Sequence, residues 1–133
     1  MPTIRVFNND TNRVEIFSRS DGQPMPYVTG GTLTVREFRG SSTSELLWTE
    51  KRAMQAWNSF RALWGRPIQV NFVFKRPYEG GHGQQSQHYA GLAFDVAHNL
   101  TNAQRAEMRA LAISSRLWGY VEPVSLSPTW VSW

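Results

Sequence analysis

Apolar and polar residues alternate in two short runs near the start of the chain, Ile4–Phe7 and Val14–Phe17. A stretch rich in Asn and Asp at positions 8–12 separates these runs, and the arrangement predicts a β-hairpin. Three glycines and two prolines fall within positions 21–31, which predicts a loop. The residues Leu33–Phe38 predict a further short strand or extended segment after that loop.

Helical spacing replaces this alternation in the next part of the chain. Apolar residues recur every three or four positions, which predicts a helix from Trp48 or Thr49 to Trp64. Gly65 and Pro67 follow, as is common where a helix ends. The buried stripe expected on this helix consists of Ala53, Ala56, Trp57, Phe60, Leu63 and Trp64.

Alternation returns after this helix and predicts several more strands. The first of them covers positions 68–74, and a polar, glycine-rich loop follows at 79–87. Two final strands are predicted at 120–122 and 129–133, on either side of a proline-containing loop. The apolar residues of the first strand are Ile68, Val70, Phe72 and Phe74.

A capping box marks the start of a second helix. Thr101 is followed three residues later by Gln104, so the helix is expected to begin near Asn102. It is expected to end near Trp118 and Gly119. Its expected buried stripe consists of Ala106, Ala110, Ile113 and Leu117.

This order of elements predicts an α+β fold, with a mainly antiparallel sheet packed against two main helices. The length of 133 residues corresponds to a single domain with an apolar core. Residues 1–32 form an N-terminal hairpin and loop extension in this interpretation, and residues 33–133 form the core. No apolar run approaches the roughly 20 residues that cross a bilayer, and no leader sequence is visible.

The amino-acid composition limits the kinds of site that the chain can form. The chain has no cysteine, which excludes disulfides, thiolate zinc sites and a cysteine nucleophile. Its formal net charge is +4, and all but two of its 14 basic residues are arginines. These arginines are scattered from Arg5 to Arg116 without the dense run that is typical of nucleic-acid binding, so a nucleic-acid partner is not expected. A mild positive field suits an anionic partner such as bacterial cell wall.

The segment from Leu92 to Ala97 alternates as a strand does. Leu92, Phe94 and Val96 would face a core, and Ala93, Asp95 and Ala97 would face the opposite side. A carboxylate in the middle of a buried strand needs a partner, and a metal ion is a good one. His88 stands seven residues before Asp95, and imidazole and carboxylate both bind zinc.

The run Ser86–Asp95 resembles the pattern S-x-H-x-x-G-x-A-x-D of the zinc D-Ala-D-Ala metallopeptidases, which share a fold with the hedgehog signalling domain. All five fixed positions are present: Ser86, His88, Gly91, Ala93 and Asp95. The broader order of elements in that family is matched from about residue 33 to residue 132. The resemblance implies a hedgehog-like fold, a Zn²⁺ cofactor, and His88 and Asp95 as zinc ligands.

The same resemblance places the third zinc ligand, a histidine, near the C-terminus. Ser132 stands at that position here, within Trp130-Val131-Ser132. A serine hydroxyl is a poor zinc ligand, so zinc affinity is expected to be low unless His82, His98 or Glu122 substitutes. Whether the chain is an active enzyme therefore stays open, although the motif favours one.

The remaining site residues follow from the family pattern and from their positions. Glu122 is the best candidate for the general base, since it is the one carboxylate between the second helix and the C-terminus. Arg76, at the end of a strand, would bind the carboxylate of the substrate or orient its carbonyl. The other expected substrate-binding residues are Ser86, His82, Tyr89 and Trp130.

Two functions fit these observations. The first is a zinc-dependent peptidoglycan peptidase, a D,D- or L,D-carboxypeptidase or endopeptidase that acts on stem peptides of the cell wall. The second is a non-catalytic peptidoglycan-binding module with the same fold, which the serine at position 132 favours. In either case we expect a monomer without a membrane span, encoded by a bacterium or phage and working outside the cell or in the cell wall.

Overall fold

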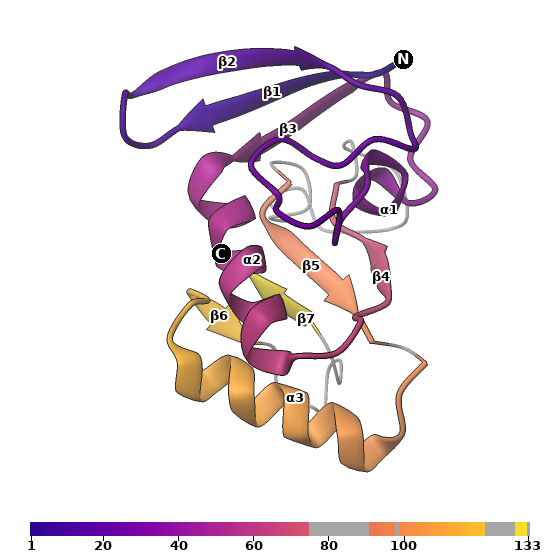
Figure 1. The fold of residues 1–133 in the computed structure, drawn as a ribbon, viewed down its shortest axis with the longest axis vertical. Helices are drawn as coiled ribbons and strands as arrows, with labels where there is room; N and C mark the ends of the chain where they lie inside the picture. The colour runs from indigo at the N-terminus through magenta and orange to yellow at the C-terminus, as the bar shows by residue number, and fades with distance from the viewer. Residues whose placement is uncertain (75–90, 98, 122–129, 133) are drawn as a thin grey trace.

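A computed structural model describes residues 1–74, 91–97, 99–121 and 130–132 of the chain. Within these ranges the fold belongs to the α+β class, with mostly antiparallel strand pairs and three helices (Figure 1). The class therefore agrees with the sequence prediction. The prediction of one sheet is wrong, because the strands form two sheets and the first contains a parallel pair.

The predicted hairpin is present at the N-terminus. Strands β1 (Thr3–Asn8) and β2 (Arg13–Ser18) pair in antiparallel register. In the connecting turn, the side-chain oxygen of Asn8 accepts the backbone N–H groups of Asp10 and Thr11. Asn side chains favour tight turns because they form such local bonds. The Asn-rich cluster therefore acts as the sequence pattern indicates.

Strand β3 (Leu46–Glu50) completes the first sheet, whose order is β2-β1-β3. It pairs in parallel with β1, with Leu47 beside Ile4 and Thr49 beside Val6. The prediction that a helix begins at Trp48 or Thr49 is therefore wrong. Both residues belong to the strand, because pairing with a distant segment takes precedence over the local helical spacing.

Residues Val35–Arg39 form a short helix, α1, and the predicted strand at Leu33–Phe38 is wrong. The Thr34 side chain accepts the backbone N–H of Glu37, and the Glu37 side chain accepts the N–H of Thr34. This capping box satisfies two N–H groups that would otherwise lack partners at the start of the helix. The pattern Thr-x-x-Glu was visible in the sequence, but the alternation around it predicted a strand.

The long helix α2 (Lys51–Trp64) ends where the sequence predicts. Gly65 adopts a φ of +70° after its last turn, the left-handed conformation that commonly terminates a helix. The expected stripe is buried except for Leu63, which is 57% exposed, and Met54 is buried in addition. At the start of α2, the side chain of Asn9 accepts the N–H of Arg52, so the hairpin turn caps this helix.

The second sheet has four short strands in the order β4-β5-β7-β6. They are β4 (Val70–Phe72), β5 (Ala93–Val96), β6 (Tyr120–Val121) and β7 (Trp130–Ser132). Strand β4 is shorter than the predicted 68–74, because its register shifts between Val70 and Phe72. The N–H groups of Val73 and Phe74 then both donate to the carbonyl oxygen of Phe38.

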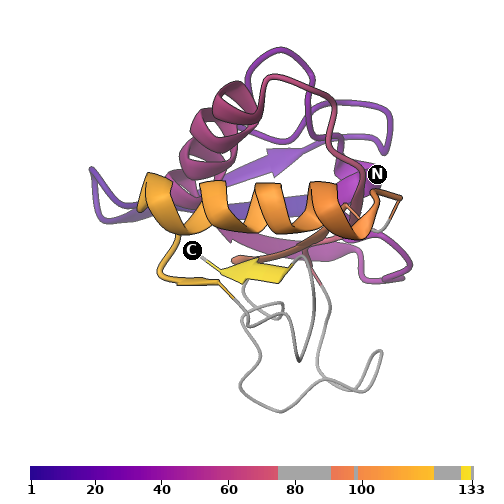
Figure 2. The same ribbon diagram turned by 90° about the horizontal axis from the view of Figure 1, so that it is seen from below.

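Helix α3 (Asn102–Ser115) begins with the predicted capping box, but it ends at Ser115, before Trp118. The predicted buried stripe is also wrong. Ala106 and Ala110 are exposed, and Ile113 is 52% exposed. Met108 and Ala112 are buried instead. They follow Ala106 and Ala110 by two positions in the sequence, so they lie on a different side of the helix. Figure 2 shows α2 and α3 on the same side of β7.

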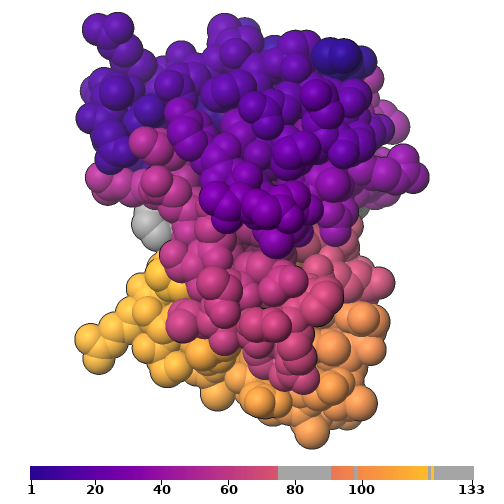
Figure 3. Space-filling view, in the orientation of Figure 1, coloured from indigo at the N-terminus to yellow at the C-terminus, as the bar shows by residue number. Residues whose placement is uncertain are grey.

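One apolar core joins the two sheets and the helices. Ile4 and Val6 of the hairpin belong to the same buried cluster as Phe94 and Val96 of β5. Trp57 of α2 belongs to the same cluster and is 1% exposed. Figure 3 shows the N-terminal residues at one end of the molecule and α3 at the other, with α2 between them. Strand β5, which carries the candidate site, therefore packs on this core through Phe94 and Val96.

Candidate functional site on strand β5

Strand β5 has one face in the apolar core and a second face on the opposite side, as the alternation predicts. Phe94 and Val96 belong to the apolar core cluster. Asp95 is half-buried, and Ala93 is completely buried yet lies outside that cluster. Side chains alternate across a strand, so Ala93 and Asp95 occupy the face away from the core. The structure thus places Asp95 in mid-strand beside a small neighbour.

The predicted position of Ala97 on this second face is wrong. Strand β5 ends at Val96, and Ala97 has a φ of +64° and belongs to the core cluster. Its N–H donates to the carbonyl of Gln69, and its own carbonyl accepts the N–H of Leu100. These bonds hold the sharp turn that leads toward α3.

The register between β5 and β7 brings the C-terminal strand next to Asp95. Asp95 pairs with Trp130, and Ala93 pairs with Ser132. Directly paired positions in an antiparallel ladder lie on the same face of the sheet. Position 132 is therefore a diagonal neighbour of Asp95, and such neighbours are about 7–8 Å apart. Long side chains can meet across this spacing, so a metal ligand at position 132 would be suitably placed beside Asp95.

Gly91, the glycine of the motif, lies against the first sheet. Its φ is +68°, and a Cβ added there would lie 1.8 Å from the carbonyl oxygen of Trp48 and 2.7 Å from the Phe38 ring. Any side chain would therefore collide with the backbone of β3. The glycine is required by this close approach as well as by its left-handed conformation.

A buried hydrogen bond fixes the same contact. The hydroxyl of Thr49 donates to the carbonyl oxygen of Gly91 at 2.8 Å, and Thr49 is 2% exposed. A buried carbonyl without a partner would destabilise the fold, so this bond helps to hold the backbone two residues before β5 against β3. Thr49 is a supporting residue that the sequence analysis missed, and no local pattern indicates its partner 42 positions away.

An aromatic cluster supports the core face of β5. The ring of Phe94 stacks on Trp57 at a centroid distance of 5.5 Å, with an interplanar angle of 6°. Phe94 also contacts Trp118 at 5.1 Å, and Trp118 contacts Phe60 edge to face at 5.7 Å. Aromatic pairs of this kind bury a large apolar area. Asp95 thus follows a residue whose side chain is fully buried in this cluster.

Most of the predicted site residues lie outside the described part of the chain. These are Arg76, His82, Ser86, His88, Tyr89, His98 and Glu122. Trp130 and Ser132 are described by their backbone pairing only. Among the described residues, no three His, Cys, Asp or Glu side chains come together in a way that could hold a metal ion. Zinc binding by His88 and Asp95 therefore stays a prediction.

A second group of ionisable side chains links the hairpin, the following loop and α2. The hydroxyl of Tyr27 donates to the carboxylate of Glu15, and this bond raises the pKa of Tyr27 above its ordinary value. Lys51 forms an ion pair with Asp10 at 2.8 Å and lies 5.2 Å from the centre of the Tyr27 ring. The hydrogen bond from Lys51 lowers the pKa of Asp10.

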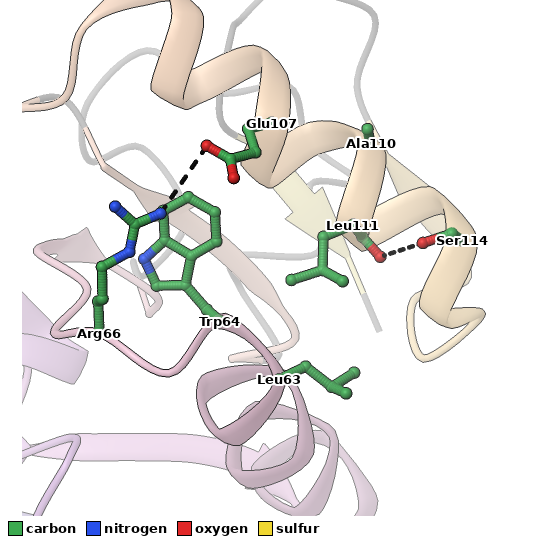
Figure 4. Close-up of a pocket in the computed structure, with 7 residues that line it drawn as sticks. All are labelled: Leu63, Trp64, Arg66, Glu107, Ala110, Leu111 and Ser114. Carbon is green, nitrogen blue, oxygen red and sulfur yellow. Dashed lines mark hydrogen bonds and ion pairs between the residues drawn. The ribbon is translucent and has the colours of Figure 1, made fainter.

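Asp95 lines neither of two hollows in the described part of the surface. Figure 4 shows the first, of about 470 Å³, between the end of α2 and α3. Its apolar wall includes Leu63, Trp64 and Leu111. At one edge the guanidinium of Arg66 lies 4.1 Å from the centre of the Trp64 ring and 3.8 Å from the Glu107 carboxylate. The guanidinium of Arg66 therefore already interacts with two groups of the protein.

No protein-family model, curated protein or solved structure matches this chain. The family that the Ser86–Asp95 motif suggests is therefore a proposal. The residues described above supply the physical context for it.

Proposed function

We propose that the chain is a zinc-dependent peptidoglycan peptidase with a hedgehog-like fold, of the D-Ala-D-Ala metallopeptidase type. The supporting observation is the register of β5 and β7, which sets Trp130 beside Asp95 and Ser132 beside Ala93. In the family pattern the final strand carries a zinc ligand, and this register gives position 132 access to the face of Asp95. The five motif residues Ser86 to Asp95 provide the second support.

Each residue of the proposed site has a distinct role. His88 and Asp95 would hold zinc, which supplies a Lewis acid and an activated water for peptide hydrolysis. Glu122 would accept the proton of the attacking water. Arg76 would pair with a substrate carboxylate, because the guanidinium fork matches its two oxygens. Ser86, His82, Tyr89 and Trp130 would contact the stem peptide.

The donor set fits zinc in kind but is incomplete in number. An imidazole and a carboxylate are both good zinc ligands, whereas catalytic zinc ordinarily has three protein ligands. Ser132 offers only a neutral hydroxyl at the third position. We therefore propose weak zinc binding and impaired hydrolysis by this chain.

Ser132 also favours a second candidate, a non-catalytic module that binds peptidoglycan. Serine at this paired position supplies no strong zinc ligand, which would leave the protein able to bind a peptide without cleaving it. In both cases the partner is the stem peptide, and the protein would act as a monomer outside the cell or in the cell wall. No helix in the described ranges has the length and apolar character needed to cross a membrane.

Zinc content and muropeptide turnover test the first proposal directly. The wild-type chain is supplied with zinc, and bound metal and cleaved stem peptides are measured beside two variants. Asp95→Asn should abolish both signals, whereas Asp10→Asn, which alters a surface ion pair, should leave both unchanged. Saturable zinc binding with turnover of stem peptides, even if both are weak, supports the peptidase. Binding to cell-wall sacculi without zinc or turnover supports the module, and absence of all three signals refutes both.

A further inference from the structure

Another hollow of the described surface is basic. It is an open depression of about 380 Å³, and most of the side chains that line it are exposed. Helix α2 contributes most of its wall, and the residues that follow α3 contribute the rest. The lining residues are Arg52, Gln55, Ala56, Ser59, Arg116 and Leu117. None of these six is acidic, and four of them carry hydrogen-bond donors.

Both arginines stand where local rules disfavour them. Arg52 lies in the first turn of α2, which contains no acidic residue, although the positive end of the helix dipole disfavours cations there. Arg116 follows α3 with a φ of +57°, a conformation that favours glycine. Departures from local preference are expected at functional sites. The two departures converge on one hollow.

The arginines also retain donors for a ligand. Arg52 contacts Asp10 through one nitrogen at 3.4 Å, and Lys51 makes the shorter contact with that carboxylate. No described residue forms an ion pair with Arg116. In the hollow of Figure 4, by contrast, Arg66 is held by Trp64 and Glu107. The basic hollow therefore has the greater capacity to bind an anion.

We propose that this hollow binds the phosphate group of a small molecule. A phosphate monoester presents three acceptor oxygens and a charge of about −1.5 to −2 near neutral pH. Two guanidinium groups from separate elements can each pair with one edge of such a group. The amide of Gln55 and the hydroxyl of Ser59 can donate further hydrogen bonds to the same oxygens, and Ala56 and Leu117 supply an apolar surface for the rest of the ligand. The proposal is independent of zinc at Asp95.

Thermal unfolding of the full chain at constant ionic strength tests it, with glycerol phosphate, inorganic phosphate or acetate added. We expect glycerol phosphate to raise the Tm of the wild type, since a ligand that binds the folded state stabilises it. Arg52→Gln and Arg116→Gly should each weaken the affinity by at least about tenfold, since a charge-assisted hydrogen bond is lost. Arg36→Gln removes the same charge from an exposed position of α1 and should leave the affinity unchanged.

Arg116→Gly separates binding from folding, because it should raise the Tm without ligand while it removes the response to phosphate. Equal affinities for inorganic phosphate and glycerol phosphate indicate that the phosphate group alone is recognised. Tighter binding of glycerol phosphate indicates that the organic part also contributes, and both results support the proposal. It is overturned if the wild type shows no phosphate response, if acetate binds as tightly, or if the hollow variants behave like Arg36→Gln.

Discussion

The backbone of Gly91 passes so close to Trp48 that a Cβ added to the glycine would lie 1.8 Å from the tryptophan carbonyl oxygen. The hydroxyl of Thr49, the next residue of β3, donates to the Gly91 carbonyl. These contacts join the first sheet to the start of the strand that carries Asp95. The motif glycine therefore helps to position the candidate site through its contacts with β3 of the first sheet.

Gly91→Ala should destabilise the fold by roughly 3 kcal/mol or more, since it adds a backbone collision to an unfavourable left-handed φ. Urea unfolding monitored by tryptophan fluorescence measures the loss. Gly22→Ala is a control that lacks both effects, because Gly22 has no left-handed φ and no atom lies within 4 Å of an added Cβ there. The control should stay within about 1 kcal/mol of the wild type. Equal effects of the two substitutions would contradict the close contact.

The two long helices end in residues that share a left-handed φ but differ in type, Gly65 after α2 and Arg116 after α3. Arg116→Gly should stabilise the fold by roughly 0.5–1 kcal/mol in moderate salt, where the loss of the arginine charge near the helix end matters little. Gly65→Ala should destabilise it by about 1 kcal/mol, because the added Cβ meets no close atom and only the φ is unfavourable. Shifts of the same sign in thermal unfolding would contradict this account.

Local signals account for the elements that the sequence predicts well. The capping box of Thr101 and Gln104 marks the start of α3, and alternation marks the hairpin. At α1 two local signals conflict, and the box formed by Thr34 and Glu37 takes precedence over alternation. On α3 the apolar residues form two possible stripes. Alanines are too small to favour one stripe, so packing against α2 and β6 decides which face is buried.

Contacts between distant segments account for what the sequence could not predict. Trp48 has helical spacing, yet it lies in β3 because β1 pairs with that segment. The strand of Asp95, the opposite faces of Phe94 and Asp95, and the strand at Ser132 agree with the predictions from the local pattern. The hydrogen bond between Thr49 and Gly91 depends on how the sheets meet, and so does the left-handed turn at Ala97. No local pattern contains that information.

Tyr27 should titrate above its ordinary pKa of 10.0, because its hydroxyl donates to the Glu15 carboxylate and loses that bond on ionisation. The stabilisation is present below pH 10 and is lost as the pH rises through the elevated pKa of the folded state. Absorbance near 295 nm follows the phenolate, and Tyr27→Phe identifies its contribution. Glu15→Gln should lower the midpoint. An unchanged midpoint in that variant would exclude Glu15 as the cause.

The ion pair between Asp10 and Lys51 predicts an effect at acid pH. Lys51 lowers the pKa of Asp10 below 3.8, so the pair stabilises the fold above that pH and the effect is lost as the pH falls through the lowered pKa. Wild type should be more stable than Asp10→Asn at pH 6, and the two should converge once the pH is low enough to protonate the Asp10 carboxylate in the folded state. Urea unfolding across this range measures the difference. A gap that persists at the lowest pH would assign the effect to something other than charge.

The pairing of Ser132 with Ala93 predicts how zinc binding could be strengthened. Ser132→His would place an imidazole diagonal to Asp95 and should raise zinc affinity at least about tenfold, since a third good ligand is added. Competition with a zinc chelator measures the affinity. Peptidase activity should rise with it if Glu122 acts as the base.

Two controls make the Ser132→His result specific. Ser18→His adds a histidine to the exposed strand β2 and should leave zinc affinity unchanged. Asp95→Asn combined with Ser132→His should remove the gain, because the two ligands are expected to act on one metal ion. If the histidine at position 132 behaves like the one at position 18, the serine does not occupy the third ligand position. The third ligand must then be sought at His82, His98 or Glu122, and the register of β5 and β7 would no longer support a zinc peptidase.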